Sequence, residues 1–209
     1  MTLNPEITFT QDGALKRTHR EFVEKGLVEE TKEAFGICFR ASFKWLACKI
    51  EGLTFPYYAD KLVSAYKKQL AYLEQPSDLL EMDISYASWV EAVRDQDVLF
   101  LNKWGSRDPY RLQCQAMRVP QLRGSMPLAG DFVCCFYGTQ KPPSDRYWGH
   151  AVAYFGSGSP RFFDANDGEY SFSSMATAAA DIDKFINGYT SPSKNKIIVD
   201  RFIYQMSKL

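Results

Sequence analysis

The sequence predicts an α+β fold in which helices come first and an antiparallel sheet follows. Apolar residues recur at helical intervals over the first half of the chain, from about residue 13 to residue 97. From residue 131 onward, short runs of β-branched and aromatic residues alternate with Gly, Pro, Ser and Asn. Because the two patterns are segregated along the chain, alternating βαβ units are not expected.

The length and composition indicate one folded domain. A chain of 209 residues can bury one sizeable core, and 45% apolar with 24% charged residues is ordinary for a soluble globular protein. Residues 1–12 hold proline and polar residues without a sustained period, so we expect an N-terminal arm there and a single domain over residues 13–209.

Four helices are expected in the first half. A short amphipathic helix between Gly13 and Gly26 carries His19. The second helix, within Gly36–Ile50, has an apolar stripe at steps of four and three, and Gly52 is a fitting stop. The remaining two are predicted over residues 57–74, ended by Pro76, and from Ser85 to about Asp97 with a continuation into VLFLNKW left open.

The second half predicts mostly strands. Residues 105–130, rich in Gly, Pro and Arg, are expected as loop with at most one strand or turn. Antiparallel strands are then predicted from the runs DFVCCFYG, WGHAVAYFG, RFFDAN and EYSF. An alanine-rich helix over residues 174–188 and a last strand, KIIVDRFIYQM, complete the domain.

Charge and cysteine content exclude several classes of protein. The 25 basic residues balance the 25 acidic ones, so no overall field attracts nucleic acid. Five cysteines without CxxC spacing, and two histidines, give little support to a zinc site or a disulfide framework and favour a reducing compartment. No Sec signal, membrane span or N-terminal myristoylation glycine is visible, and we expect neither a cofactor nor a transmembrane segment.

Cys38 is the candidate nucleophile. It falls in the expected first turn of an apolar helix, where the helix dipole and unpaired backbone N–H groups favour a thiolate over a thiol. Cys48, Cys134 and Cys135 lie in dense apolar runs and are expected as core residues, with Cys114 intermediate.

His150 and Asp164 supply the partners that such a thiolate needs. His150 opens the strand GHAVAYF, and Asp164 ends RFFD after the turn GSGSP. Antiparallel pairing of these strands can bring the carboxylate beside the imidazole, completing a nucleophile, base and orienting acid. Asn166 is an alternative orienting residue, while Asp167 and Glu169 are interpreted as turn residues around Gly168.

Three stretches together resemble the YopT/AvrPphB-type cysteine proteases. They are Gly36-x-Cys38 with Ser42, Trp45 and Leu46, then Gly149-His150-Ala-Val, and then FFDANDGEYSF over residues 162–172. They occur in the order of that family, and the third is the most specific. The resemblance covers roughly residues 30–175, with most of the intervening sequence unmatched.

The resemblance implies a papain-like fold, with a helical lobe carrying the catalytic cysteine packed on an antiparallel sheet carrying His and Asp. It implies a Cys38, His150, Asp164 triad without a cofactor or metal. It further implies a thiol endopeptidase, a bacterial effector or toxin made in the bacterial cytoplasm without a Sec signal, secreted into a host cell and contributing to virulence by cleaving a host protein. No oligomeric state follows from the sequence.

Two departures from the family pattern leave the chemistry open. Ala165 stands where the family has proline. The window of residues 28–37 contains no Gln or Asn to complete an oxyanion hole, only Thr31, Lys32 and Glu33 among its polar residues near that place. Two alternatives to a protease therefore stay open. Either the triad serves a glutamine deamidase, transglutaminase or acyltransferase, or the chain is an inactive papain-like binding module.

Overall fold

The computed structural model describes residues 5–27, 37–55, 62–73, 85–107, 109–118, 129–140, 146–190 and 196–209. Its helices are α1 (Asp12–Glu24), α2 (Cys38–Ile50), α3 (Leu62–Leu73), α5 (Tyr86–Gly105) and α6 (Met175–Asn187). Its strands are β1 (Ile7–Thr8), β2 (Leu112–Arg118), β3 (Asp131–Gln140), β4 (Arg146–Phe155), β5 (Arg161–Asp164), β6 (Gly168–Ser171) and β7 (Lys196–Lys208).

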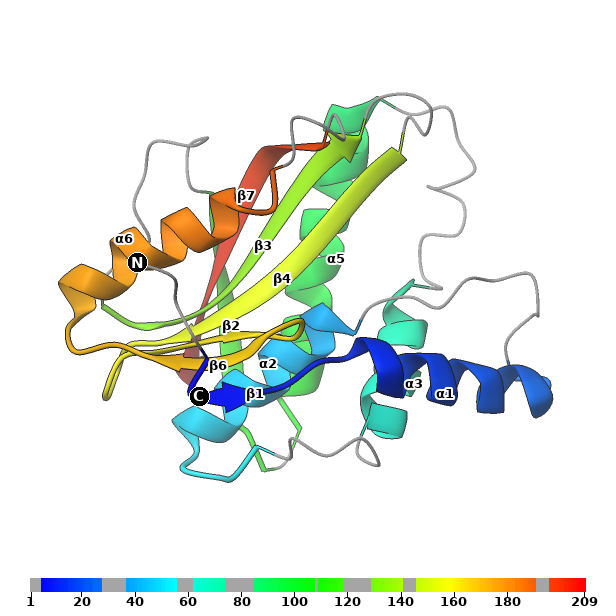
Figure 1. The fold of residues 1–209 in the computed structure, drawn as a ribbon, viewed down its shortest axis with the longest axis horizontal. Helices are drawn as coiled ribbons and strands as arrows, with labels where there is room; N and C mark the ends of the chain where they lie inside the picture. Colours follow the sequence, from blue (N-terminus) through cyan, green and yellow to red (C-terminus); the bar gives the residue numbers. More distant parts are fainter. Residues whose placement is uncertain are drawn as a thin grey trace.

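The described strands form one antiparallel sheet. Its order is β1-β6-β5-β4-β3-β7-β2, so the chain folds back between neighbours from β3 to β6 and then returns with β7 to the far side of β3. Figure 1 shows the long strands β3, β4 and β7 crossing the molecule, with the short strands β5 and β6 beside the lower part of β4. The prediction of an α+β protein with an antiparallel sheet is confirmed.

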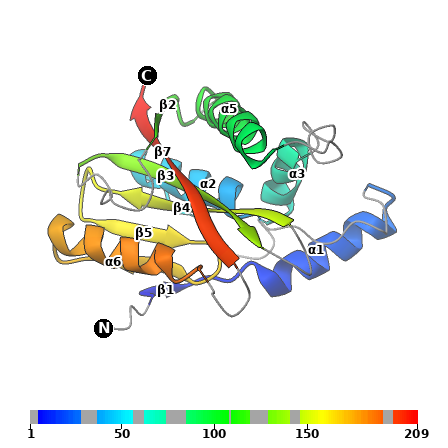
Figure 2. The ribbon, with the colours of Figure 1, turned by 90° about the horizontal axis from the view of Figure 1, so that it is seen from above.

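Helices cover both faces of the sheet. Figure 2 shows α6 beneath one face and α2, α3 and α5 above the other. Each face has its own apolar layer: Phe43, Leu46 and Phe163 belong to the layer under α2, whereas Phe136 and Phe162 pack with Ile182 of α6. Buried aromatic rings fill much of both layers, and their packing sets the position of the helices on the sheet.

The helical predictions agree with the structure where it describes the residues. Helix α2 begins at Cys38, its residues Phe39, Phe43 and Leu46 are buried, and the chain leaves it at Gly52 with a φ of 68°. Helix α5 takes the continuation that the sequence left open and runs to Gly105. Of the third predicted helix, residues 57–61 and 74 lie outside the described residues.

The strand predictions agree as well, with two additions. The segment expected as loop over residues 105–130 contains β2, which pairs with β7. The segment expected as an N-terminal arm contains β1, which pairs with β6 at Ile7 and Thr8. Gly168 stands opposite Thr8 with a φ of 133°, and a Cβ there would meet the Ile7 carbonyl oxygen at 2.0 Å, so only glycine fits.

Candidate active site

Cys38 is the first residue of α2. Ile37 precedes it as the N-cap without a side-chain cap. The first four backbone N–H groups of a helix have no partner within the helix, and the positive end of the dipole lies there. The half-buried Cys38 side chain packs at the margin of the apolar layer under α2.

His150 lies in the middle of β4, at a place where one neighbouring strand has ended. Strand β3 pairs with β4 throughout, with Phe136 opposite His150. Strand β5 pairs only with Val152 to Phe155. Because β5 stops short, this side of β4 is left open at His150, and the imidazole can reach the start of α2 around the end of the shorter strand.

Asp164 is the carboxylate that contacts His150. Its Oδ2 atom lies 3.0 Å from His150 Nε2, and both side chains are buried, Asp164 completely. Asn166, the alternative, instead donates its backbone N–H to Asp164 Oδ1 at 2.6 Å. Asn166 therefore orients the carboxylate, and the carboxylate orients the ring.

Cys38 lies close enough to His150 to affect the pKa of the imidazole. Burial lowers the pKa of His150, but the charge of Cys38, together with side-chain hydrogen bonds to Asp164 and Cys38, outweighs it and raises the pKa to about 10. Since Nε2 faces Asp164, Nδ1 is the ring nitrogen available to the sulfur. The raised pKa favours the protonated imidazolium, which lies between Cys38 and Asp164.

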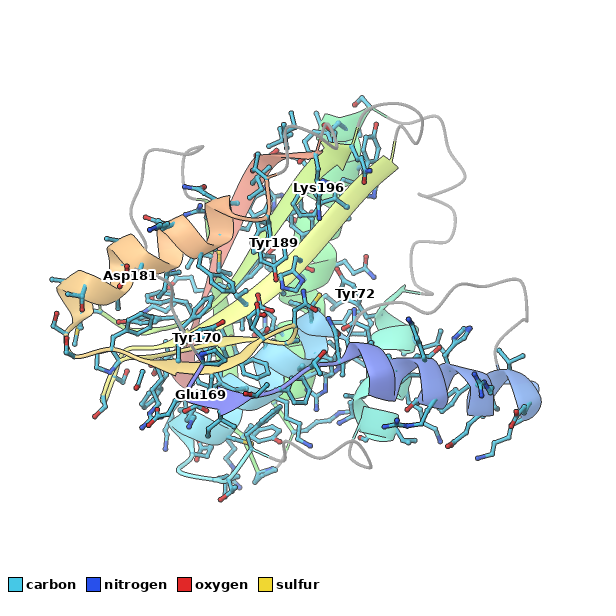
Figure 3. The ribbon with its side chains drawn as sticks, in the orientation of Figure 1. Tyr72, Glu169, Tyr170, Asp181, Tyr189 and Lys196 are labelled. Atoms are coloured by element: carbon cyan, nitrogen blue, oxygen red, sulfur yellow. The ribbon has the colours of Figure 1, made fainter. Side chains whose placement is uncertain are left out.

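Tyr189, just after α6, covers the pair of His150 and Asp164. Its ring stacks on the imidazole at a centroid distance of 4.6 Å and an angle of 25°, and its hydroxyl donates to Asp164 Oδ2 at 2.8 Å. Figure 3 shows Tyr189 over the centre of β4. Burial and the Asp164 charge raise the pKa of its hydroxyl, so it remains a protonated donor. The sequence analysis missed this residue.

Gln11 is a second residue that the sequence analysis missed. Its Oε1 atom accepts a hydrogen bond from the backbone N–H of Ile37 at 2.7 Å, and its Nε2 atom donates to Asn166 Oδ1 at 2.6 Å. Its own backbone N–H donates to the Ala165 carbonyl at 3.2 Å. One amide thus ties the residue before Cys38 to the loop after Asp164.

Side chains of the three sequence motifs hold α2 against the sheet. Ser42 donates to the carbonyl of Ala151, next to His150, at 3.0 Å. Trp45 stacks on Phe163 at 5.5 Å and donates its indole N–H to Glu169 Oε2 at 2.8 Å. These contacts set the position of Cys38 relative to both His150 and Asp164.

The interpretation of Glu169 as a turn residue is wrong. It lies in β6, fully buried, and its Oε1 atom also accepts from Lys49 at 2.8 Å and Arg161 at 2.7 Å. Two cations and an indole N–H satisfy the charge, which is why burial is tolerated. Asp167, by contrast, is an exposed turn residue as predicted.

The remaining candidates take structural positions or lie outside the described residues. All five cysteines are free; Cys48, Cys134 and Cys135 are buried, and Cys114 is half-buried, as predicted. His19 lies on α1 with Nδ1 2.6 Å from the Tyr66 hydroxyl. Thr31, Lys32 and Glu33, the residues considered for the oxyanion hole, lie outside the described residues.

The described residues show neither a metal site nor a membrane-spanning helix. Within the described ranges, no group of three or more His, Cys, Asp and Glu side chains could hold a metal ion. No helix in the same ranges is long and apolar enough to cross a bilayer. In comparisons with known proteins, no family model and no curated protein matches the chain.

Proposed function

We propose that the protein is a thiol endopeptidase with Cys38 as nucleophile, His150 as general base and acid, and Asp164 as the residue that orients His150. The observation that carries the proposal is the contact of one buried imidazole with Cys38 on one side and with Asp164, 3.0 Å away, on the other. A helix with its first residue as nucleophile, packed on an antiparallel sheet bearing the base and acid, is the papain-like arrangement that the three motifs imply.

The residues support acyl transfer in two stages. The Cys38 sulfur attacks the peptide carbonyl carbon, and the oxyanion that forms is stabilised by unpaired N–H groups at the start of α2. His150 then gives its proton to the leaving amine, and the carbon–nitrogen bond breaks. In the second stage His150 removes a proton from water, the hydroxide attacks the thioester, and the sulfur leaves as thiolate.

The likeness of the motifs to bacterial effector proteases gives the proposal its setting. We propose a host-cell protein as substrate and delivery from a bacterium without a Sec signal. Neither setting nor substrate enters the chemistry above, which depends only on the three side chains and the start of α2.

The test is a comparison of new protein N-termini in a host-cell lysate after incubation with wild type, Cys38→Ala and His150→Ala. We expect cleavage sites produced by wild type and by neither variant. Cys114→Ala, which removes another half-buried thiol, is the matched control and should cleave like wild type. Identical cleavage by wild type and Cys38→Ala overturns the proposal, and a mass gain of about 1 Da on a glutamine without chain cleavage replaces it with deamidation.

A titration tests the ion pair without knowledge of the substrate. In wild type we expect the His150 imidazole, followed by NMR, to titrate near the raised pKa of about 10. In Cys38→Ala the pKa should fall, since burial still lowers it and the opposing charge of Cys38 is gone. The same His150 titration in both proteins, with an unchanged circular dichroism spectrum, contradicts the pairing.

A further inference from the structure

The face of α2 turned away from His150 carries an unusual cation. The Arg40 side chain is 3% exposed, and its Nε and Nη1 atoms are buried without any hydrogen-bond partner. Its guanidinium carbon lies 5.1 Å from the Phe43 ring centre and 4.8 Å from that of Trp104. Aromatic faces offset part of the lost hydration, but they leave the N–H groups unsatisfied.

More cations gather around Arg40. The backbone N–H of Arg40 donates to Gln69 on α3 at 3.0 Å, which places α3, with the half-buried Lys68, against the first turn of α2. The exposed Arg107 lies in the turn after α5, where its carbonyl accepts from the Tyr110 N–H at 3.0 Å. The Tyr110 ring packs on Phe43 at 5.9 Å, so this turn closes the same corner.

Positive charge is concentrated at this corner of the described structure. Burial, and then the charges of Arg40, Arg107 and Lys44, lower the pKa of Lys68 to about 8. Burial also lowers the pKa of Arg40 to about 10, with Arg107 adding to the effect and Tyr110 and Cys48 opposing it. No carboxylate in the described ranges contributes to the pKa of either group. Like charges held together in this way create a site for an anion.

We propose that the corner of α2, α3 and the turn after α5 binds the phosphate group of a small phosphorylated molecule. Lys68 and Arg107 would contact the phosphate oxygens from the solvent side, with the Arg40 guanidinium beneath them and the rings of Tyr110 and Trp104 as walls. The three cations differ in burial: Arg107 is exposed, Lys68 is half-buried and Arg40 is buried. A tetrahedral dianion supplies the several acceptor atoms that unpaired guanidinium and ammonium donors require.

The site is separate from the proposed catalytic centre. Arg40 and Cys38 are two positions apart on a helix, so their side chains point to different faces of α2. Failure of one proposal therefore leaves the other standing. Any effect of the anion on the proposed catalysis would pass through α2 itself.

The test is calorimetric titration of the full chain with sulfate, orthophosphate and pyrophosphate, with chloride at matched ionic strength as the blank. We expect saturable binding of all three oxyanions, weakened about tenfold by Lys68→Gln and by Arg107→Gln. Lys16→Gln and Arg17→Gln on exposed positions of α1 make the same charge changes elsewhere and should bind like wild type. Tighter binding of pyrophosphate supports a ligand with linked phosphates. Absence of saturable binding, or equal weakening by the α1 variants, overturns the proposal.

A pH series identifies Lys68 as a direct contact. Sulfate keeps its charge between pH 6 and 10, so changes in its affinity report on the protein. Because the ammonium form of Lys68 binds the anion and its pKa is about 8 without ligand, affinity should fall as the pH rises through 8. Lys68→Arg should retain binding and lose this dependence. A Lys68→Arg variant that keeps the wild-type dependence refutes the contact.

Discussion

Tyr189 is placed to hold the imidazole of His150, the proposed base, in position. Its ring lies on the His150 imidazole, and its hydroxyl shares Asp164 Oδ2 with His150 Nε2. The hydroxyl also accepts from Asn166 Nδ2 at 3.0 Å. Rotation of the imidazole away from Asp164 would also break its stacking with Tyr189, so these contacts hold the ring in one orientation.

Tyr189→Phe should slow the chemistry of Cys38 while leaving the fold intact. The ring stack stays, but Asp164 Oδ2 loses one donor and Asn166 loses an acceptor. We expect the alkylation rate of Cys38 by a thiol-reactive epoxide to fall about fivefold, which corresponds to one hydrogen bond of about 1 kcal/mol. Tyr154→Phe is the control, since it removes a buried hydroxyl that has no partner. Equal rates in the two variants would show that the Tyr189 hydroxyl has no positioning role.

The sequence suggested Cys38, His150 and Asp164 as site residues, a prediction that stays open, and gave no indication of Tyr189 and Gln11. Cys38 and Asp164 stand at the ends of their elements, and His150 lies in the middle of a strand that the sequence pattern also marked. Tyr189 follows α6 in a polar segment, and Gln11 precedes α1, so no periodicity relates either to the site. One signal was available for Gln11: a polar residue at the N-cap position of α1, although its side chain serves α2 instead.

At the level of elements, the seating of α2 on the sheet depends on a buried carboxylate. Glu169 in β6 joins Trp45 and Lys49 of α2 to Arg161 of β5. Trp45 and Lys49 are four residues apart and so lie on the same face of the helix. The error about Glu169 has a physical origin: it follows Asn, Asp and Gly, which are typical of turns, and only the pairing of β6 with β5 and β1 shows that the strand has already begun.

Glu169→Ala should destabilise the protein strongly. Glu169 is completely buried. Removing its carboxylate leaves Lys49, Arg161 and the Trp45 indole N–H without their common acceptor. We expect a loss of about 3 kcal/mol in the free energy of unfolding by urea. Glu51→Ala breaks an exposed ion pair with Lys208 and should cost less than about 1 kcal/mol. Similar losses in both variants would contradict the structural role of Glu169.

At the scale of the whole molecule, one buried carboxylate lies among the apolar residues of the core. Asp97 of α5 is fully buried and accepts hydrogen bonds from the hydroxyls of Tyr72 on α3, Tyr137 on β3 and Tyr204 on β7. One carboxylate therefore joins two helices to two neighbouring strands. Burial raises its pKa to about 6, although hydrogen bonds from the three hydroxyls and from Cys135 lower it.

Asp97 should make stability depend on pH between about 4 and 6. In that interval the folded state keeps a proton that the unfolded state has released, so wild-type stability falls as the pH rises, by about 3 kcal/mol in total. Asp97→Asn lacks the ionisable carboxyl group. Its free energy of unfolding relative to that of wild type should therefore rise by about 3 kcal/mol from pH 4 to pH 7. Urea unfolding at several pH values measures the difference. A constant difference across the range would mean that Asp97 is ionised throughout.

The Asp97→Asn comparison needs a control for the substitution itself. Asp95→Asn makes the same change two residues earlier on α5, at a side chain that is 73% exposed. Its effect on stability should stay within about 0.5 kcal/mol. Asp97 falls on the apolar stripe of α5 between Val93 and Phe100, so the helical spacing alone places it toward the core. Its pairing could not be predicted, because the three hydroxyl partners come from three other elements.

The two hydrogen bonds of the Gln11 side chain have a practical consequence for work with the protein. Gln11, in the short stretch ahead of α1, is bonded both to Ile37 and to the loop after Asp164, so removing that stretch would disturb the position of Cys38. Leu209, just after β7, is 71% exposed. A reporter dye attached there would leave these contacts intact.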